Sequence, residues 1–369
     1  MNILAIEPYF LGSHKAFIEG LQSHSAHTVI PVTLHNTGRK WHMHGDSLSL
    51  AQKAKRVEPK IDIILASSMT NIPAFLALTN PRFARTPKLL YMHENQLTQP
   101  VPEGEKRDQT YCYMNYLSML SVDKLLFTTR YHFTDFMNTL PGFLQHYPGE
   151  VHPYTIQEIK NKSSVLNPGL DLKRFDAHPD TRSQNKVKKI VWNQRWQFDR
   201  NPASFFRVLN RLNDAEFEFE LILAGDSKHN KPVEFEQACE RYGQRITHFG
   251  FVEDFEKYSK LLHEGDVVVS TATYEFFCVA VMEAIYCGCH PLVPKALHYP
   301  DLIPNHLHNP LLHAPVLYEN EDELFSNLRS ILNSDAKCLP KSSLQKINRH
   351  LDWSEMIATY DQLFEGMID

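Results

Sequence analysis

The chain has 369 residues, of which 43% are hydrophobic and 22% are charged, and its formal net charge is −5. The length predicts two or three domains, and the composition is that of a soluble globular protein. No run of about 18 apolar residues occurs, so we expect no membrane-spanning helix, and the acidic balance argues against DNA binding by a broadly basic surface.

The six cysteines and the first residues of the chain bear on its compartment. The cysteines lie far apart in the sequence except for Cys287 and Cys289, so they do not form a disulfide framework. Residues 1–7 are too few and have the wrong flanks for a signal peptide, and they are typical of a first strand. We therefore expect a cytoplasmic protein.

Positive charge is concentrated in the first half of the chain. Residues 1–168 hold 16 Lys and Arg against 13 Asp and Glu, so the remainder is net negative. The basic side chains between 37 and 60 are Arg39, Lys40, Lys53, Lys55, Arg56 and Lys60. We expect a polyanionic partner to meet this half, and an ordinary solvated surface remains the alternative.

The first two predicted strands are each followed by a loop whose residues could contact a ligand. Strand 2–7 leads into loop 8–13, where Gly12 permits a positive φ and a close approach of backbone to a ligand. A strand at 28–34 leads into the polar loop His35–His44, in which Trp41 offers a stacking surface between basic residues. This loop is a candidate RNA contact. Its histidines lack Cys or Asp partners at ligand spacing, so we predict no metal site there.

Two further buried strands, 61–66 and 88–92, end in polar loops. These loops are Ser67–Asn71 and His93–Val101. Because ligands of α/β folds bind at the carboxyl ends of parallel strands, we expect His93, Asn95 and Gln96 to face a substrate.

The second half begins after a turn-rich linker at 165–170. Strand 189–193 is followed by a loop that carries Arg195 and Arg200, which can converge on a pyrophosphate. Strand 246–249 ends in Gly-Phe-Val252, whose backbone would face a nucleotide base.

The most informative stretch is 266–294, where the pattern predicts strand, loop, helix and strand. Glu275 lies in the loop and Glu283 lies inside the helix, eight positions later. Carboxylates at these places can each accept hydrogen bonds from a pair of sugar hydroxyls, and the N–H groups at 276–279 suit a phosphate.

The pair of glutamates resembles the E-x7-E motif of retaining GT-B glycosyltransferases of the family-4 type. Five further motifs are similar to those of the tRNA-queuosine mannosyltransferase family, and we identify the chain as a bacterial-type member. They are the opening 3–15, Arg39-Lys-Trp-His42, Leu65-Ala-Ser-Ser-Met-Thr-Asn71, Tyr91-Met-His-Glu-Asn-Gln-Leu97 and Glu275-Phe-Phe-Cys-Val279.

The resemblance implies an α/β, GT-B fold of two Rossmann-like domains that face a cleft. Residues 1–168 would form the acceptor domain, joined by a final helix at 352–369 that crosses back to it, and residues 169–351 the donor domain. It also implies transfer of mannose from GDP-mannose to the cyclopentenediol of queuosine at the wobble position of tRNA-Asp, without a metal ion. Another hexose stays open.

The resemblance also assigns roles to residues. The catalytic set is His93, Glu275, Arg195 and Arg200. Contacts to the nucleotide sugar are assigned to Gly12, Ser13, Phe251, Val252, Phe276, Phe277, Cys278, Val279 and Glu283. The tRNA contacts are assigned to Arg39, Lys40, Trp41, His42, Lys53, Lys55, Arg56, Asn95 and Gln96.

One departure and two alternatives accompany this assignment. Many family-4 enzymes have glycine where this chain has Phe276 and Cys278, so these side chains narrow the space beside the sugar. Cys278 at a helix start is either a small pocket-lining residue or a reactive thiol of low pKa. The alternatives are a glycosyltransferase for a lipid or small molecule, and a non-catalytic protein that binds a nucleotide sugar or tRNA.

Overall fold

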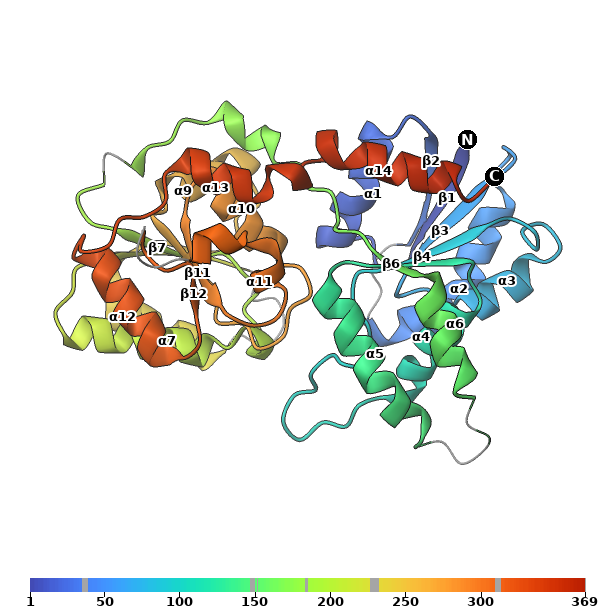
Figure 1. Cartoon of the computed structure of the whole chain (residues 1–369), viewed down its shortest axis with the longest axis horizontal. Helices are drawn as coiled ribbons and strands as arrows, with labels where there is room; N and C mark the ends of the chain where they lie inside the picture. The colour runs from blue at the N-terminus through green and yellow to red at the C-terminus, as the bar shows by residue number, and fades with distance from the viewer. Residues whose placement is uncertain are drawn as a thin grey trace. The chain divides into compact units, whose positions relative to one another are not determined.

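The computed structural model describes residues 1–34, 39–146, 150, 152–182, 185–225, 232–308 and 313–368, with the backbone alone for 39–45. The chain divides into two compact units. Unit 1 consists of Met1–Asp171 and Leu351–Asp369, and unit 2 of Leu172–His350. Figure 1 shows a sheet flanked by helices in each unit. No helix in these ranges is long and apolar enough to cross a membrane.

Unit 1 is built on a six-stranded parallel sheet with the order β2-β1-β3-β4-β5-β6. Its strands are β1 (Asn2–Glu7), β2 (Thr28–Thr33), β3 (Ile63–Ser67), β4 (Lys88–Met92), β5 (Lys124–Phe127) and β6 (Ser163–Val165). The helices are α1 (Gly12–His24), α2 (Arg39–Lys55), α3 (Ile72–Thr79), α4 (Gln109–Leu120), α5 (Arg130–Leu144), α6 (Tyr154–Lys162) and α14 (Trp353–Glu365).

Both faces of this sheet are covered, because successive side chains of a strand point to opposite faces. In β1, Leu4 and Ile6 join the apolar cluster that packs against α2 to α6, whereas Ile3 and Ala5 join the cluster under α1 and α14. The sequences of these strands are therefore continuous apolar runs, which is typical of parallel strands that are buried on both faces.

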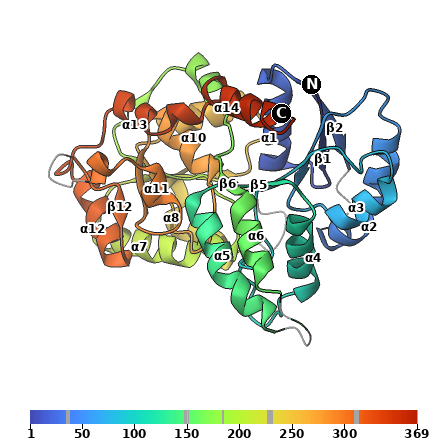
Figure 2. The ribbon, with the colours of Figure 1, turned by 45° about the vertical axis from the view of Figure 1, so that its right-hand side comes forward.

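The last helix, α14, returns to unit 1 and packs beside α1 (Figure 2). Its first residue, Trp353, is 2% exposed and lies where a side chain at Gly20 or Gly169 would collide with its ring. Asp352 caps the helix by accepting a hydrogen bond from the Ser354 N–H at 3.0 Å.

Unit 2 repeats the plan with the strand order β12-β11-β10-β7-β8-β9, again all parallel. Its strands are β7 (Lys189–Trp192), β8 (Glu220–Ala224), β9 (Ile246–Gly250), β10 (Val267–Val269), β11 (His290–Pro294) and β12 (Leu317–Tyr318). The helices are α7 (Pro202–Asp214), α8 (Val233–Tyr242), α9 (Phe255–Glu264), α10 (Val279–Cys287), α11 (Tyr299–Leu302), α12 (Glu321–Leu332) and α13 (Lys341–Asn348).

Each sheet has a point where the strand order reverses, and ligands of open α/β sheets bind in the crevice outside the strand ends there. In unit 1 this point lies between β1 and β3, and in unit 2 it lies between β7 and β10. The chain segments that leave β1, β7 and β10 carry the assigned residues Gly12, Ser13, Arg195, Arg200, Glu275, Phe276, Phe277, Cys278, Val279 and Glu283.

The prediction of a loop as far as His44 is wrong, because helix α2 begins at Arg39. The segment is rich in good helix formers, and Leu50, Ala51 and Ala54 bury one face of the helix against the sheet. Residues 35–38 of the expected loop lie outside the described residues.

Candidate functional site

In unit 2, Glu275 and Arg200 meet directly. Glu275 follows β10, and Arg200 is the last residue of the short 3-10 helix Phe198–Arg200 that follows β7. The Arg200 Nη2 lies 2.7 Å from Glu275 Oε2, and its Nη1 lies 3.1 Å from Asp199 Oδ2. Burial alone lowers the pKa of Arg200, but the two carboxylates outweigh it and raise the pKa, so the guanidinium stays charged.

The turn from Glu275 to Cys278 is held by its own carboxylate and by His298. Glu275 Oε1 accepts hydrogen bonds from the Phe276 and Phe277 N–H groups at 3.1 and 3.4 Å. His298 Nε2 accepts the Cys278 N–H at 3.4 Å, and its Nδ1 lies 3.2 Å from the Glu275 carbonyl oxygen. Since Nε2 accepts, Nδ1 carries the proton and donates it. Three N–H groups assigned to phosphate binding are thus already bonded within the protein.

Burial determines the protonation of His298. This side chain is fully buried, and that burial lowers the pKa of His298 to about 4. The imidazole is therefore neutral at pH 7, which is the state that the two hydrogen bonds require.

Glu283 lies inside α10 and has a partner for each oxygen. Arg174 Nη2 is 2.9 Å from Oε1, and the Tyr258 hydroxyl donates to Oε2 at 2.9 Å. Burial, followed by the charge of Glu283, raises the pKa of Tyr258 well above its ordinary value, so this hydroxyl keeps its proton. These two partners fix the orientation of the carboxylate, and with it the directions of the remaining lone pairs.

The other candidates of unit 2 lie at different depths. Arg195 and Phe251 are exposed and Val252 is half-buried. Phe276 is buried, whereas Phe277 and Val279 are half-buried. Arg195 and Arg200 therefore differ, since Arg195 is an exposed residue and the guanidinium of Arg200 is enclosed between two carboxylates.

Cys278 is not a reactive thiol. It is 5% exposed, and burial, followed by the charge of Glu275, raises the pKa of Cys278 to about 12. A thiol with this pKa is protonated at pH 7 and a poor nucleophile. The structure thus overturns the alternative of a low-pKa cysteine.

In unit 1, His93 directly follows β4 and packs against His14, with ring centroids 4.2 Å apart and an angle of 32° between the ring planes. Burial and the nearby His14 and His132 lower the pKa of His93 well below its ordinary value. Gly12 has a φ of +51°, as the sequence argument required, and it begins α1 together with the exposed Ser13.

The assigned tRNA contacts separate into exposed, buried and undescribed side chains. Lys53, Lys55 and Arg56 are exposed at the end of α2. Asn95 is 0% exposed and its Oδ1 accepts the Thr98 N–H at 2.8 Å, so a direct RNA contact by Asn95 does not fit this structure. The side chains of Arg39, Lys40, Trp41 and His42 lie outside the described residues.

Asn115 in α4 connects two of the motif loops of unit 1. Its Nδ2 donates to the Ser68 carbonyl at 2.8 Å, and its Oδ1 accepts the Gln96 N–H at 2.9 Å. Gln96 itself is half-buried. The loops after β3 and β4 are therefore held in one arrangement by a single buried amide.

Sequence reasoning missed several residues that build these sites. They are Glu7, His14 and Asn115 in unit 1, and Arg174, Tyr258 and His298 in unit 2. Most of them contact residues that are distant in the sequence. Arg174 and Glu283, for example, are 109 positions apart. Only Glu7 had a local signal, as a charged residue that ends an apolar strand.

Comparisons with known families match both units. Residues 2–170 match the family described as tRNA-queuosine alpha-mannosyltransferase N-terminal, and residues 173–339 match glycosyl transferases group 1. A tRNA-queuosine alpha-mannosyltransferase from Drosophila melanogaster is 31% identical over an alignment of 375 residues, and this alignment covers 95% of this chain and 97% of that protein.

Two solved structures show the fold. A sucrose-phosphate synthase from Thermosynechococcus elongatus has a TM-score of 0.73 at 15% identity and covers 100% of this chain and 99% of its own. Anabaena HepE in complex with UDP has a TM-score of 0.69 at 16% identity and covers 99% of this chain and 100% of its own. The α/β, GT-B fold class predicted from the sequence is confirmed.

Proposed function

The chain belongs to the tRNA-queuosine alpha-mannosyltransferase family and is a glycosyltransferase, and we propose that it transfers mannose from GDP-mannose to queuosine in tRNA. The acceptor is the cyclopentenediol of queuosine at the wobble position of tRNA-Asp, and the reaction takes place in the cytoplasm. The observation that carries this proposal is the family match over both units, together with an intact pair of carboxylates, Glu275 and Glu283.

We assign the donor to unit 2. Glu275 accepts hydrogen bonds from sugar hydroxyls, and the buried Arg200 fixes its position. Glu283, held by Arg174 and Tyr258, accepts from the ribose diol. Arg195, whose guanidinium is exposed, neutralises charge on the departing diphosphate, an effect worth about 3–4 kcal/mol per well-placed group.

We further propose that the reaction retains the configuration of the sugar and needs no divalent metal at the donor. The leaving phosphate takes the proton of the attacking hydroxyl on the same face of the sugar. The cationic Arg195 provides the charge that a metal ion supplies in other transferases.

We assign the acceptor tRNA to unit 1. Lys53, Lys55 and Arg56 are exposed cations on one helix end, which is where phosphates would be held. His93, at the carboxyl end of β4, contacts the sugar from this unit.

The test of the proposal is the nucleoside content of tRNA. Mass spectrometry of tRNA digests from cells with and without the gene should show a hexosyl-queuosine that disappears with the gene and returns with the wild-type chain. The Glu275→Gln chain is the matched control and should not restore it. Unchanged tRNA nucleosides would refute the acceptor and point to a lipid or small molecule.

Purified protein then decides the donor and the metal. With GDP-mannose, GDP-glucose and UDP-glucose offered separately, only GDP-mannose should label queuosine-containing tRNA. Calorimetry should find the same GDP affinity with and without EDTA. Binding that disappears on chelation and returns with Mg²⁺ would contradict the metal-free assignment.

A further inference from the structure

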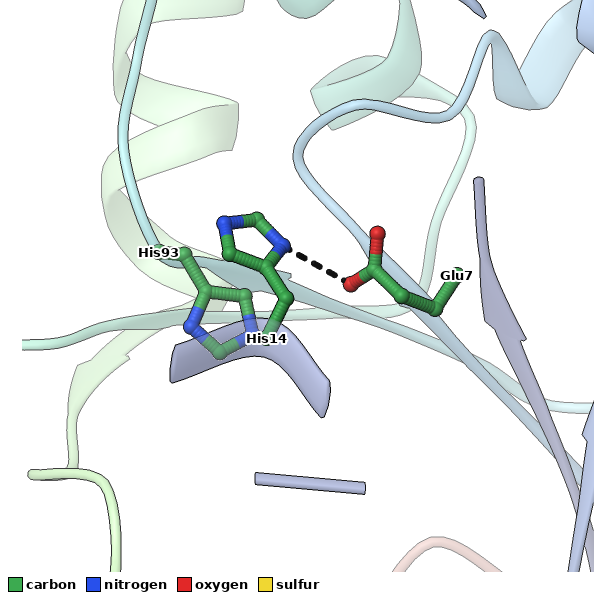
Figure 3. Close-up of side chains that lie close together, drawn as sticks. All are labelled: Glu7, His14 and His93. Carbon is green, nitrogen blue, oxygen red and sulfur yellow. Dashed lines mark hydrogen bonds and ion pairs between the residues drawn. The ribbon is translucent and has the colours of Figure 1, made fainter. Parts of the chain in front are cut away.

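Three potential metal ligands from distant parts of unit 1 converge at the carboxyl edge of its sheet. Glu7 ends β1, His14 lies in the first turn of α1, and His93 follows β4. One ligand atom from each lies within 4.8 Å of the other two. Figure 3 shows the Glu7 carboxylate directed at the His14 ring, with the His93 ring beside it.

The carboxylate of Glu7 is removed from water. Glu7 is 0% exposed, so its charge must be balanced by protein groups. Its Oε1 accepts the Tyr9 N–H at 2.8 Å, and its Oε2 lies 2.9 Å from His14 Nδ1. In the part of the chain that the structure describes, His14 is the one cationic or titratable group paired with this carboxylate.

His93 provides a second, independent observation. Its Nε2 is buried and has no hydrogen-bond partner among the described residues. A buried polar nitrogen without a partner costs about 1–3 kcal/mol, which a ligand would recover. The residue as a whole is partly exposed, which leaves a route from solvent.

We propose that Glu7, His14 and His93 form a binding site for a divalent transition-metal ion of the Zn²⁺ or Co²⁺ type. Two imidazole nitrogens and one carboxylate oxygen are a three-ligand set found in catalytic zinc sites, which keep a fourth position open. Mg²⁺ and Ca²⁺ prefer oxygen ligands alone and do not suit it.

Existing contacts already orient the ligands. The Tyr9 N–H holds the second oxygen of Glu7, as hydrogen bonds to metal-bound carboxylates do. On binding, the metal replaces the proton between Glu7 and His14, and that proton leaves to solvent. The site lies in unit 1 and shares His93 with the sugar contact proposed above, so a bound metal ion and the sugar would compete for this side chain. The metal-free nucleotide contacts, in contrast, are assigned to unit 2.

The probe for this site is Co²⁺ alone, added to the full chain after dialysis against EDTA. Cys239 is exposed, and because thiolates are ligands for soft metals, the parent for these measurements is the Cys239→Ser variant. We expect one Co²⁺ per chain, with visible d–d bands and no sulfur-to-cobalt charge transfer. Mg²⁺ in excess should not displace it.

Variants then identify the ligands. His93→Gln and Glu7→Gln should each weaken Co²⁺ binding by more than about 10-fold, since loss of a supporting group alone costs that much. His24→Gln, an exposed histidine of the same helix α1, should bind as the parent does. Equal binding by His93→Gln and the parent, or no saturable band in the parent, overturns the proposal.

X-ray absorption of the Zn²⁺-loaded chain supplies a measurement that needs no variant. Two imidazoles in the coordination shell support the site, and a shell without imidazole refutes it. Neither readout uses sugar transfer, so this inference and the proposed function can fail independently of each other.

Discussion

Each unit places a carboxylate near the point where its strand order reverses, but the two carboxylates have different partners. In unit 1, Glu7 is the last residue of β1 and faces imidazoles. In unit 2, Glu275 follows β10 and faces the guanidinium of Arg200 at 2.7 Å. A guanidinium is charged at every accessible pH, whereas imidazoles exchange protons and metals. Unit 2 therefore has a fixed partner for its carboxylate, and the metal site proposed for unit 1 would be exchangeable.

The loops at these points are also held differently. In unit 1 an amide, Asn115, bonds the loops after β3 and β4 to each other, and in unit 2 a neutral imidazole, His298, bonds two backbone groups of the turn from Glu275 to Cys278. In both cases a buried side chain from elsewhere in the sequence fixes the loop. Removing such a group leaves backbone atoms without partners, which costs more than the bond itself contributes.

The fixed character of unit 2 is tested most severely by Arg200→Met. Removal of the buried cation leaves Asp199 and Glu275 close together without it, so we expect a loss of about 3–5 kcal/mol in the free energy of unfolding. Chemical denaturation measures the loss. Arg195→Met, an exposed neighbour, should change stability by less than about 0.5 kcal/mol. Equal stability of the two variants would show that the buried arginine does not hold the site.

The two glutamates of unit 2 should separate transfer from nucleotide binding. Glu275→Gln should remove most transfer, with a cost of about 3–4 kcal/mol, because the carboxylate is assigned to the sugar. GDP affinity should be nearly unchanged. Glu283→Ala should weaken GDP by about 1–3 kcal/mol, the scale of a hydrogen bond to a charged group. Calorimetry with GDP decides, and equal losses of GDP binding would contradict the two roles.

Acid should destabilise unit 2 through its buried histidines. Burial lowers the pKa of both His290 and His298 to about 4. The unfolded chain takes up protons near pH 6.5 while the native state does not, so stability is complete above 6.5 and falls as the pH drops to 4. The loss is about 3 kcal/mol per histidine. Denaturant midpoints at pH 7.5 and 4.5 should differ less in His290→Gln than in the parent.

Substitutions at the basic end of α2 should weaken the binding of tRNA but not the binding of GDP. Replacing Lys53, Lys55 and Arg56 by Ala should weaken tRNA binding and reduce its salt dependence by about 0.7–0.9 for each phosphate that is no longer neutralised. GDP affinity should not change. Replacement of three exposed cations of unit 2, Arg241, Lys257 and Lys260, is the charge-matched control and should leave tRNA binding intact. A triple variant of α2 that binds like wild type at every salt concentration would make the segment ordinary surface.

The last and smallest expected effect is a difference in alkylation between two cysteines. Iodoacetamide at pH 7.5 should modify the exposed Cys239 and leave Cys278 unmodified, because Cys278 is buried and burial raises its pKa to about 12. Peptide mass spectrometry reports both sites. Early alkylation of Cys278 would show that the turn after Glu275 opens in solution.

The fold and half of the site were accessible from the sequence for identifiable reasons. Buried parallel strands are short apolar runs, so 266–294 could be divided correctly into strand, loop, helix and strand. The start of helix α2 could not be predicted from the segment after residue 34. Its polar residues suggested a loop, and the helix depends on the packing of Leu50 and Ala54 in the core of unit 1. Partners such as Arg174 and His298 carry no local pattern, since only the folded chain brings them to Glu283 and Glu275.

The return of α14 makes unit 2 an insertion into unit 1 rather than an appendage at its end. The two crossings between the units run next to each other, since Leu170 N–H donates to the Leu351 carbonyl and Trp353 N–H to the Leu170 carbonyl, each at 2.8 Å. Unit 2 therefore leaves and re-enters unit 1 at one place. Because Leu170 and Asp352 pair in parallel, excision of unit 2 would need a connecting loop between Asp171 and Leu351 that reverses the chain direction. Conversely, deleting the last helix would open the core of unit 1 under Trp353 and Tyr360, although these residues are the farthest in sequence from β1.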